Sequence, residues 1–249
     1  MTKSIVVFGS GPGLGQAVAH RYANDGYTVT LVARHAEPLE QLASELRAAG
    51  GNAHAVAADL SDTANVAKLA EQIREQAGEP DAIYYGPTPG GTARPTTAAP
   101  QRPSELAPED VQAYLPTGFY TLVALVREFV GQMLEQQDGA VLTAGGASAV
   151  RGVPYFSGPG PSLAAARNYL ECLDAELAGT GVFVGRLYIG ATIKDSAWHQ
   201  HIRAMEAAGQ PTRSGDTIVD PADLADILWK MHHTTKQAEV LYPEGLFDR

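Results

Sequence analysis

Cysteine, lysine and long apolar runs are scarce in this chain of 249 residues. Cys172 is the only cysteine, so no internal disulfide can form and no second cysteine is present to share a metal. No apolar run reaches the length of about eighteen residues that a membrane helix needs, so no transmembrane helix is expected. The chain begins directly on a strand-like segment and shows no secretory signal. These absences favour a cytoplasmic protein.

Positive charge is also limited, since 18 Lys and Arg residues face 28 Asp and Glu residues, for a formal net charge of −10. An acidic surface repels phosphate backbones and anionic lipid headgroups, so neither nucleic acid nor a membrane is expected as a partner. His199 and His201 lie two residues apart on a predicted helix, and His232 and His233 are adjacent. Each pair therefore points to different helix faces, and we expect no metal site.

Strand and helix signals alternate through most of what remains, which is typical of a parallel sheet covered on both faces. We predict an α/β fold: a Rossmann-type doubly wound parallel sheet of about seven strands. No internal repeat or linker divides residues 1–249, so we expect one domain. The predicted strands are 4–8, 28–33, 53–58, 81–85, 140–144, 182–189 and 239–242. The predicted helices are 16–24, 37–49, 61–76, 110–137 with a kink at Pro116, 162–178, 197–208 and 221–232.

The first predicted strand, Ser4 to Phe8, leads directly into the segment Gly9-Ser10-Gly11-Pro12-Gly13-Leu14-Gly15. Glycine is needed where the backbone takes positive φ or approaches a ligand closely. The helix that follows directs its free N–H groups and positive dipole end at this turn, which suits a phosphate group. The order strand, glycine turn and helix therefore predicts a phosphate-binding turn, although a turn without a ligand has the same pattern.

The spacing Gly9-x-x-x-Gly13-x-Gly15 after Phe8 resembles the glycine motif of the short-chain dehydrogenase/reductase family, and the resemblance extends from Ile5 to about Asp195. It implies a bound dinucleotide. Family members place an Asp at the position of Asp59 against the adenine edge, although Asp59 could instead cap the next helix. The segment Ile189-Gly190-Ala191-Thr192 stands where the family's backbone meets the nicotinamide amide. The residues expected to bind the cofactor are Gly9, Ser10, Gly11, Gly13, Leu14, Gly15, Arg34, Asp59, Leu60, Gly86, Pro87, Ile189, Gly190 and Thr192.

The end of the second strand indicates which dinucleotide is bound. Sites that prefer NAD usually carry an acidic residue there, about twenty residues past the glycines, to bind the ribose hydroxyls. Here Ala33 occupies that position and Arg34 follows it. A guanidinium group can bind a 2′-phosphate with two hydrogen bonds, which favours NADP(H). Alternatively, Arg34 is an ordinary solvated residue at the end of a strand.

The resemblance also implies a catalytic tetrad, which this sequence does not match. The family uses an Asn in the kinked helix, a Ser after the fifth strand, and a Tyr-x-x-x-Lys pair on the next helix. An ungapped alignment places Leu115, Gly146, Pro159 and Leu163 at these four positions. No tyrosine in the chain has a lysine four residues later, and no lysine lies between positions 69 and 193.

Replacement groups are available nearby. Tyr155, Ser148 and Tyr85 are the candidate catalytic residues, and Arg167 could offer a cation one helical turn beyond Leu163. Each of them could equally be an ordinary packed or solvent-facing side chain. The catalytic residues therefore stay unassigned from the sequence.

Three functions remain open. The first is an NADP(H)-dependent oxidoreductase acting on a small carbonyl or alcohol, with a non-standard or degenerate active site. The second is a non-catalytic NADP(H)-binding sensor or scaffold, and the third is a lyase or isomerase on the same scaffold. A lid-like segment at about 194–216 is expected to cover the substrate side. The resemblance further implies a homodimer or homotetramer, built on two helices whose apolar positions include Val126, Val130, Leu170, Leu173 and Leu177.

Overall fold

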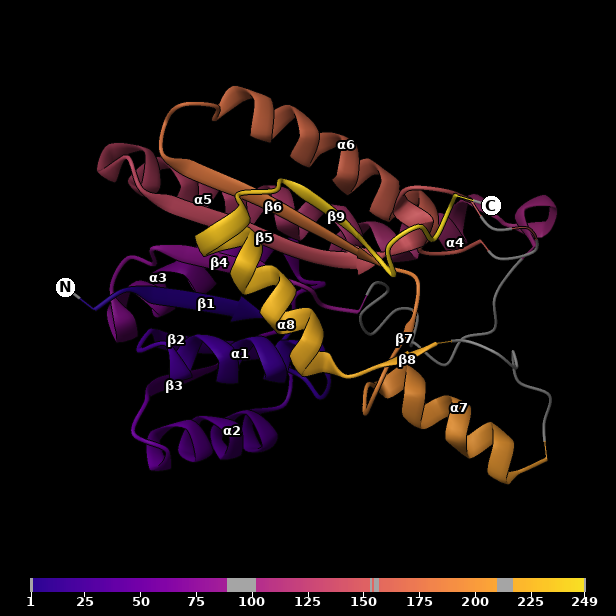
Figure 1. The fold of residues 1–249 in the computed structure, drawn as a ribbon, viewed down its shortest axis with the longest axis horizontal. Helices are drawn as coiled ribbons and strands as arrows, with labels where there is room; N and C mark the ends of the chain where they lie inside the picture. The colour runs from indigo at the N-terminus through magenta and orange to yellow at the C-terminus, as the bar shows by residue number, and fades with distance from the viewer. Residues whose placement is uncertain (1, 89–101, 153, 155–156, 210–216, 249) are drawn as a thin grey trace.

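The computed structural model describes residues 2–88, 102–152, 154, 157–209 and 217–248. Seven parallel strands form one sheet in the order β3-β2-β1-β4-β5-β6-β9 (Figure 1). Because the order reverses direction at β1, the sheet is doubly wound, and the predicted fold class is confirmed. The strands are β1 Ser4–Phe8, β2 Thr28–Ala33, β3 Asn52–Ala57, β4 Ala82–Tyr85, β5 Gly139–Gly146, β6 Val182–Ile189 and β9 Glu239–Tyr242.

Helices cover both faces of this sheet. The apolar residues of α1, α2 and α8 pack into one core cluster with the strands, and those of α3, α5 and α6 pack into a second cluster on the opposite face. The helices are α1 Leu14–Asn24, α2 Ala36–Ala48, α3 Val66–Ala77, α4 Pro108–Leu115, α5 Thr121–Gln136, α6 Gly160–Glu176, α7 Ala197–Ala207 and α8 Pro221–Lys230. Short helical turns are η1 Thr63–Asn65, η2 Pro103–Glu105, η3 Pro116–Tyr120, η4 Ala147–Ala149 and η5 Met231–Thr235.

The long helix predicted over residues 110–137, with a kink at Pro116, is interrupted at that residue. Pro116 opens a π-helical turn, η3, which joins α4 to α5. Proline lacks a backbone N–H group and clashes with the preceding turn, so the regular hydrogen-bond ladder cannot continue through this position.

A short pair of parallel strands lies outside the main sheet. β7 Thr192–Ile193 pairs with β8 Ile218–Val219, and α7 belongs to the chain that connects them. In Figure 1, α7 lies beyond β7 and β8, apart from the layers that sandwich the main sheet. No side chain of α7 is fully buried. The helix was predicted from the sequence, whereas the two strands on either side of it were not.

The apolar side chains of α5 and α6 that were expected at an oligomer interface are buried in the core. Val126, Val130, Leu170, Leu173 and Leu177 are all buried in the core cluster beneath these two helices. On the same long helical element, Tyr120 and Leu134 remain exposed. No helix among the described residues is long and apolar enough to cross a membrane.

Candidate functional site

The glycine turn joins β1 to α1 at the carboxyl end of the sheet. Gly13 has a φ of +94°, in the region that favours glycine. A Cβ atom on Gly15 would stand 2.0 Å from the carbonyl oxygen of Gly9, so any larger residue would force the turn open. Apart from its two chain neighbours, no described residue has a heavy atom within 4 Å of the corresponding position on Gly11. The turn is therefore tight on its inner side, open at Gly11, and followed at Leu14 by the free N–H groups of α1.

Ser10 ties this turn to the neighbouring strand. Its buried hydroxyl donates to the carbonyl oxygen of Val7 (2.6 Å) and accepts from the backbone N–H of Val32 (3.1 Å). The backbone N–H of Gly9 also donates to the carbonyl oxygen of Val32 (2.9 Å). These bonds fix the end of β2, and with it the backbone of Arg34, relative to the glycine turn.

Arg34 follows the last residue of β2 and is exposed. Its guanidinium group makes no hydrogen bond or ion pair with any residue that the structure describes. An unpaired guanidinium group is available to an anionic ligand.

Asp59 and Leu60 lie at the end of the adjacent strand, β3. The Asp59 carboxylate accepts from the backbone N–H (2.9 Å) and the hydroxyl (2.7 Å) of Ser61. Leu60 is buried, and its carbonyl oxygen accepts from the Thr121 hydroxyl (2.6 Å). Asp59 therefore orders the turn that leads towards α3 without capping a helix, and its other carboxylate oxygen makes no hydrogen bond with a described residue.

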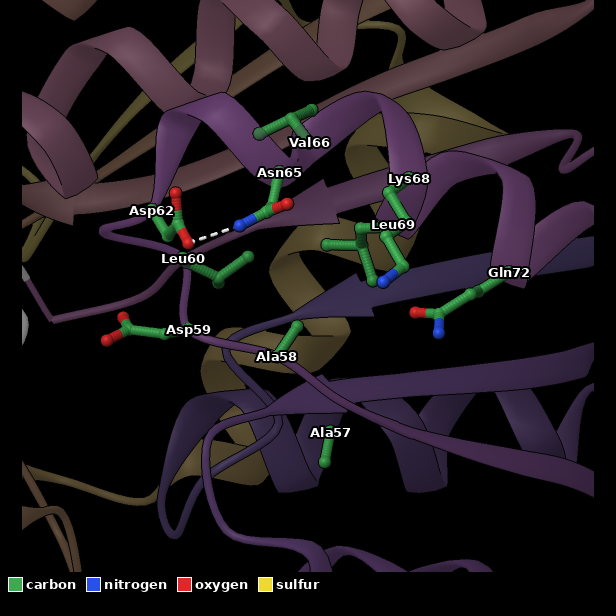
Figure 2. Close-up of a pocket in the computed structure, with 10 residues that line it drawn as sticks. All are labelled: Ala57, Ala58, Asp59, Leu60, Asp62, Asn65, Val66, Lys68, Leu69 and Gln72. Atoms are coloured by element: carbon green, nitrogen blue, oxygen red, sulfur yellow. Dashed lines mark hydrogen bonds between the residues drawn. The ribbon is translucent and has the colours of Figure 1, made fainter.

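Asp59 and Leu60 also line a cavity of about 250 Å³ between the end of β3 and α3 (Figure 2). The floor of the cavity comes from Ala57 and Ala58, and its α3 wall includes Lys68 and Gln72. The other residues expected to bind the cofactor do not line it. The cavity therefore borders the predicted adenine contact on its α3 side.

The remaining cofactor candidates gather at the same end of the sheet. The backbone N–H of Gly86 donates to the carbonyl oxygen of Phe8 (3.0 Å), and Pro87 N lies 2.8 Å from where a Cβ on Gly9 would stand. Gly190 donates its backbone N–H to the carbonyl oxygen of Tyr242 (2.7 Å). Ile189 ends β6 beside Gly146 of β5, and Thr192 is buried in β7. The carboxyl ends of β1, β4, β5 and β6 thus bring these segments together.

A contact that the sequence analysis missed places the start of α7 at the turn. A Cβ on Gly13 would stand 3.3 Å from Cα and Cβ of Ser196, the residue that caps α7. The Ser196 hydroxyl accepts from the backbone N–H of His199 (3.2 Å). A serine directly before a predicted helix is a capping signal, but nothing in the sequence indicates that this cap faces Gly13.

The three candidate catalytic residues differ in their surroundings. The Ser148 hydroxyl oxygen lies 3.5 Å from where a Cβ on Gly146 would stand, and it has no hydrogen-bond partner among the described residues. The Tyr85 hydroxyl is buried and donates to the carbonyl oxygen of Thr117 (2.6 Å). Burial raises the pKa of Tyr85 well above its usual value, so the phenol stays protonated. Tyr155 lies outside the described residues.

Arg167 does not offer the free cation considered for it. Its guanidinium group binds both carboxylate oxygens of Glu239 (3.1 and 2.9 Å) and pairs with Glu171 (2.9 Å). The two bonds to Glu239 hold its guanidinium group at the start of β9. Leu163, one turn earlier, instead faces β5, with Cδ2 and Cδ1 at 3.6 and 3.7 Å from the Cβ positions of Gly145 and Gly146. Within the described ranges, no three His, Cys, Asp or Glu side chains group as metal ligands.

Comparison with known proteins adds the family. Residues 3–206 match the family model described as short chain dehydrogenase. The 1-deoxy-11-beta-hydroxypentalenate dehydrogenase of Streptomyces exfoliatus is 31% identical over 234 residues, which cover 92% of this chain and 79% of that protein.

Solved structures share the fold at lower identity. An alcohol dehydrogenase from the archaeon Thermococcus sibiricus, complexed with 5-hydroxy-NADP, aligns with a TM-score of 0.77 at 21% identity, covering 97% of this chain and 96% of that one. A 3-oxoacyl-[acyl-carrier protein] reductase from Brucella melitensis with bound NAD aligns with a TM-score of 0.76 at 18% identity, covering 96% and 89%. The fold therefore accommodates either dinucleotide.

Proposed function

Because the chain belongs to the short-chain dehydrogenase family, we propose that it is an NADP(H)-binding oxidoreductase with a non-standard active site. In this proposal it transfers a hydride to or from a small carbonyl compound or alcohol. The observation that carries the choice of cofactor is the unpaired guanidinium group of Arg34 at the end of β2, where Ala33 replaces the acidic residue typical of NAD sites.

Each part of the dinucleotide has residues suited to it. The 2′-phosphate suits Arg34, and the diphosphate suits the turn from Gly9 to Gly15, because the open backbone at Gly11 and the start of α1 favour an anion. Asp59 and Leu60 would meet the adenine. Gly86, Pro87, Ile189, Gly190 and Thr192 would border the nicotinamide half. When bound, the cofactor supplies or accepts the hydride, and the chain binds and orients it.

The reacting end depends on a replacement for the usual hydrogen-bond donors. Gly146, Pro159 and Leu163 have no side-chain proton to give to a carbonyl oxygen at the positions where related enzymes carry Ser, Tyr and Lys. The unpartnered Ser148 hydroxyl lies beside the empty side-chain position of Gly146 and is suited to polarise a substrate carbonyl. A donor to a developing oxyanion contributes about 3–4 kcal/mol, while loss of a general acid costs roughly 3–5 kcal/mol. We therefore expect slow turnover of ordinary ketones.

A second function is favoured by the same vacated positions. A sensor or scaffold that responds to NADP(H) needs the dinucleotide half of the site and no proton donor. Such a sensor would bind the same cofactor as the proposed oxidoreductase, and only the lack of turnover would distinguish the two. We also propose a dimer or tetramer, with the exposed Tyr120 and Leu134 at the helical face that would be covered; a monomer mass in light scattering would contradict this.

Fluorescence titration with NADPH and NADH tests the cofactor assignment. Wild-type protein should bind NADPH more tightly, and R34A should lose about tenfold in NADPH affinity while its NADH affinity stays unchanged. R127A is the matched control, because Arg127 is also exposed and unpartnered among the described residues but lies on α5. Equal affinity of the wild type for both cofactors would refute NADP(H) preference. Turnover of a ketone panel with NADPH then separates the oxidoreductase from the sensor.

A further inference from the structure

Tyr188, in β6, carries a buried polar atom that the fold leaves unsatisfied. The residue is 4% exposed, and its hydroxyl is the one buried side-chain polar atom of the described residues with no hydrogen-bond partner. Leaving such a group unpaired costs about 1–3 kcal/mol. Burial also raises the pKa of Tyr188, so the phenol is protonated and can donate.

The same residue lines a small cavity of about 30 Å³ between the sheet, η3 and α6. This volume exceeds the roughly 10–15 Å³ that one water molecule requires. A water also needs two to four polar partners, and four residues with hydroxyl groups line the cavity: Tyr85, Thr117, Thr143 and Tyr188.

The donors and acceptors of these hydroxyl groups match one water molecule. Tyr85 already donates to the carbonyl oxygen of Thr117 (2.6 Å), and Thr143 donates to that of Gly185 (3.3 Å). Both hydroxyl oxygens keep lone pairs that can accept. Tyr188 has a proton to donate and no acceptor among the described residues.

We propose that this cavity binds one ordered water molecule, which accepts a hydrogen bond from Tyr188 and donates to Tyr85 or Thr143. The water joins β4, β5 and β6 at the level of Leu163, the apolar residue that also borders the cavity. Leu163 on α6 has no polar side-chain group. The water instead offers hydrogen bonds at this level, and it is held there by Tyr188 of β6.

The water has a consequence for the cofactor, and this step rests on the proposed function. Tyr188 directly precedes Ile189 and Gly190, which would border the nicotinamide, and Pro87 also lines the cavity. Holding the Tyr188 ring fixes the end of β6. Tyr188 is therefore a positioning residue for the bound cofactor.

A crystal structure that resolves ordered solvent tests the water directly. We expect a water about 2.8 Å from the Tyr188 hydroxyl oxygen in the wild type, and none at that position in Y188F. A cavity without such a water in the wild type would overturn the proposal.

The direction in which Y188F changes Tm gives an independent test. If a water is bound, Y188F removes one of its partners and should lower Tm by about 2–4 °C. If the cavity is dry, Y188F removes an unsatisfied hydroxyl, so an unchanged or higher Tm would contradict the proposal. Y169F is the matched control on α6, where Tyr169 is half-buried, and its Tm should not change.

The cofactor step has its own measurement. Y188F should weaken NADPH binding by roughly two- to tenfold, whereas Y169F should not. If the wild type binds NADPH and Y188F binds it equally well, the positioning role is refuted and the proposed function stands. If the wild type binds no NADPH, the proposed function fails together with the positioning role, while the crystal structure and the Tm still decide the water site.

Discussion

Acid should weaken this fold through one buried histidine, His232. Its Nδ1 lies 3.0 Å from the Tyr22 hydroxyl, and its ring stacks on Phe183 with ring centroids 6.4 Å apart. Burial, followed by the positive charges of His233, Lys236 and Lys3, lowers the pKa of His232 to about 3. The neutral ring is therefore the form that the folded state accommodates.

The size of the effect follows from proton linkage. An unfolded His232 titrates near 6.5, so between pH 6.5 and 3 the unfolded state binds a proton that the folded state excludes. The stability that depends on neutral His232 is complete above pH 6.5 and is lost as the pH falls towards 3. At pH 5 the loss is about 2 kcal/mol, from 1.5 pH units at about 1.36 kcal/mol each.

Urea denaturation of the wild type and H232N at pH 7.5 and pH 5 measures this loss. The Asn side chain keeps an acceptor for the Tyr22 hydroxyl but does not titrate, so H232N should lose about 2 kcal/mol less than the wild type between the two pH values. H35N, at an exposed position, should lose as much as the wild type. Equal losses for the wild type and H232N would refute the argument.

Three further substitutions have defined outcomes. S148A should lower kcat for any ketone that the protein reduces by roughly 10²-fold with unchanged NADPH affinity, and an unchanged kcat would remove Ser148 from the reaction. Gly15→Ala should lower the free energy of unfolding by about 1–3 kcal/mol, because its Cβ would meet the Gly9 carbonyl oxygen, whereas Gly11→Ala should not; equal stability of the two variants would contradict this. E239Q should cost about 2 kcal/mol in urea denaturation, because it removes the charge that pairs with both Arg167 and the buried Arg186, and a cost below that of the exposed-pair control E171Q would refute it.

The strands of the main sheet were predictable from the sequence because local signals determine them. The second and sixth predicted strands agree with β2 and β6 residue for residue, since continuous β-branched and apolar runs mark strands buried on both faces. The interruption of the α-helix at Pro116 was predictable because proline cannot donate in a helix. Its form as a π-helical turn was not, because that depends on how α4 and α5 pack.

The partners of the site residues could not be predicted in the same way. Arg167 and Glu239 are 72 positions apart, and their two hydrogen bonds exist because β9 pairs beside β6 under α6. Ser148 and Tyr188 likewise lack hydrogen-bond partners among the described residues because the surrounding elements place no suitable polar group beside their hydroxyl groups. Sequence patterns report the residue types at a site, while tertiary packing decides which of their hydrogen bonds are already used.

The parallel pairing of β7 with β8 sets a minimum length for the chain between them. Thr192 pairs with Ile218 and Ile193 with Val219, so the chain leaving β7 must travel back along the strand before β8 begins. A parallel connection needs a dozen or more residues, and α7 contributes eleven residues to it. Insertions in residues 194–217 can therefore be tolerated, but a deletion down to a tight turn would break the hydrogen bonds from Thr192 to Thr217 (2.8 Å) and from Lys194 to Val219 (2.9 Å). Grafts of this segment from related proteins should keep a helical spacer between the two strands.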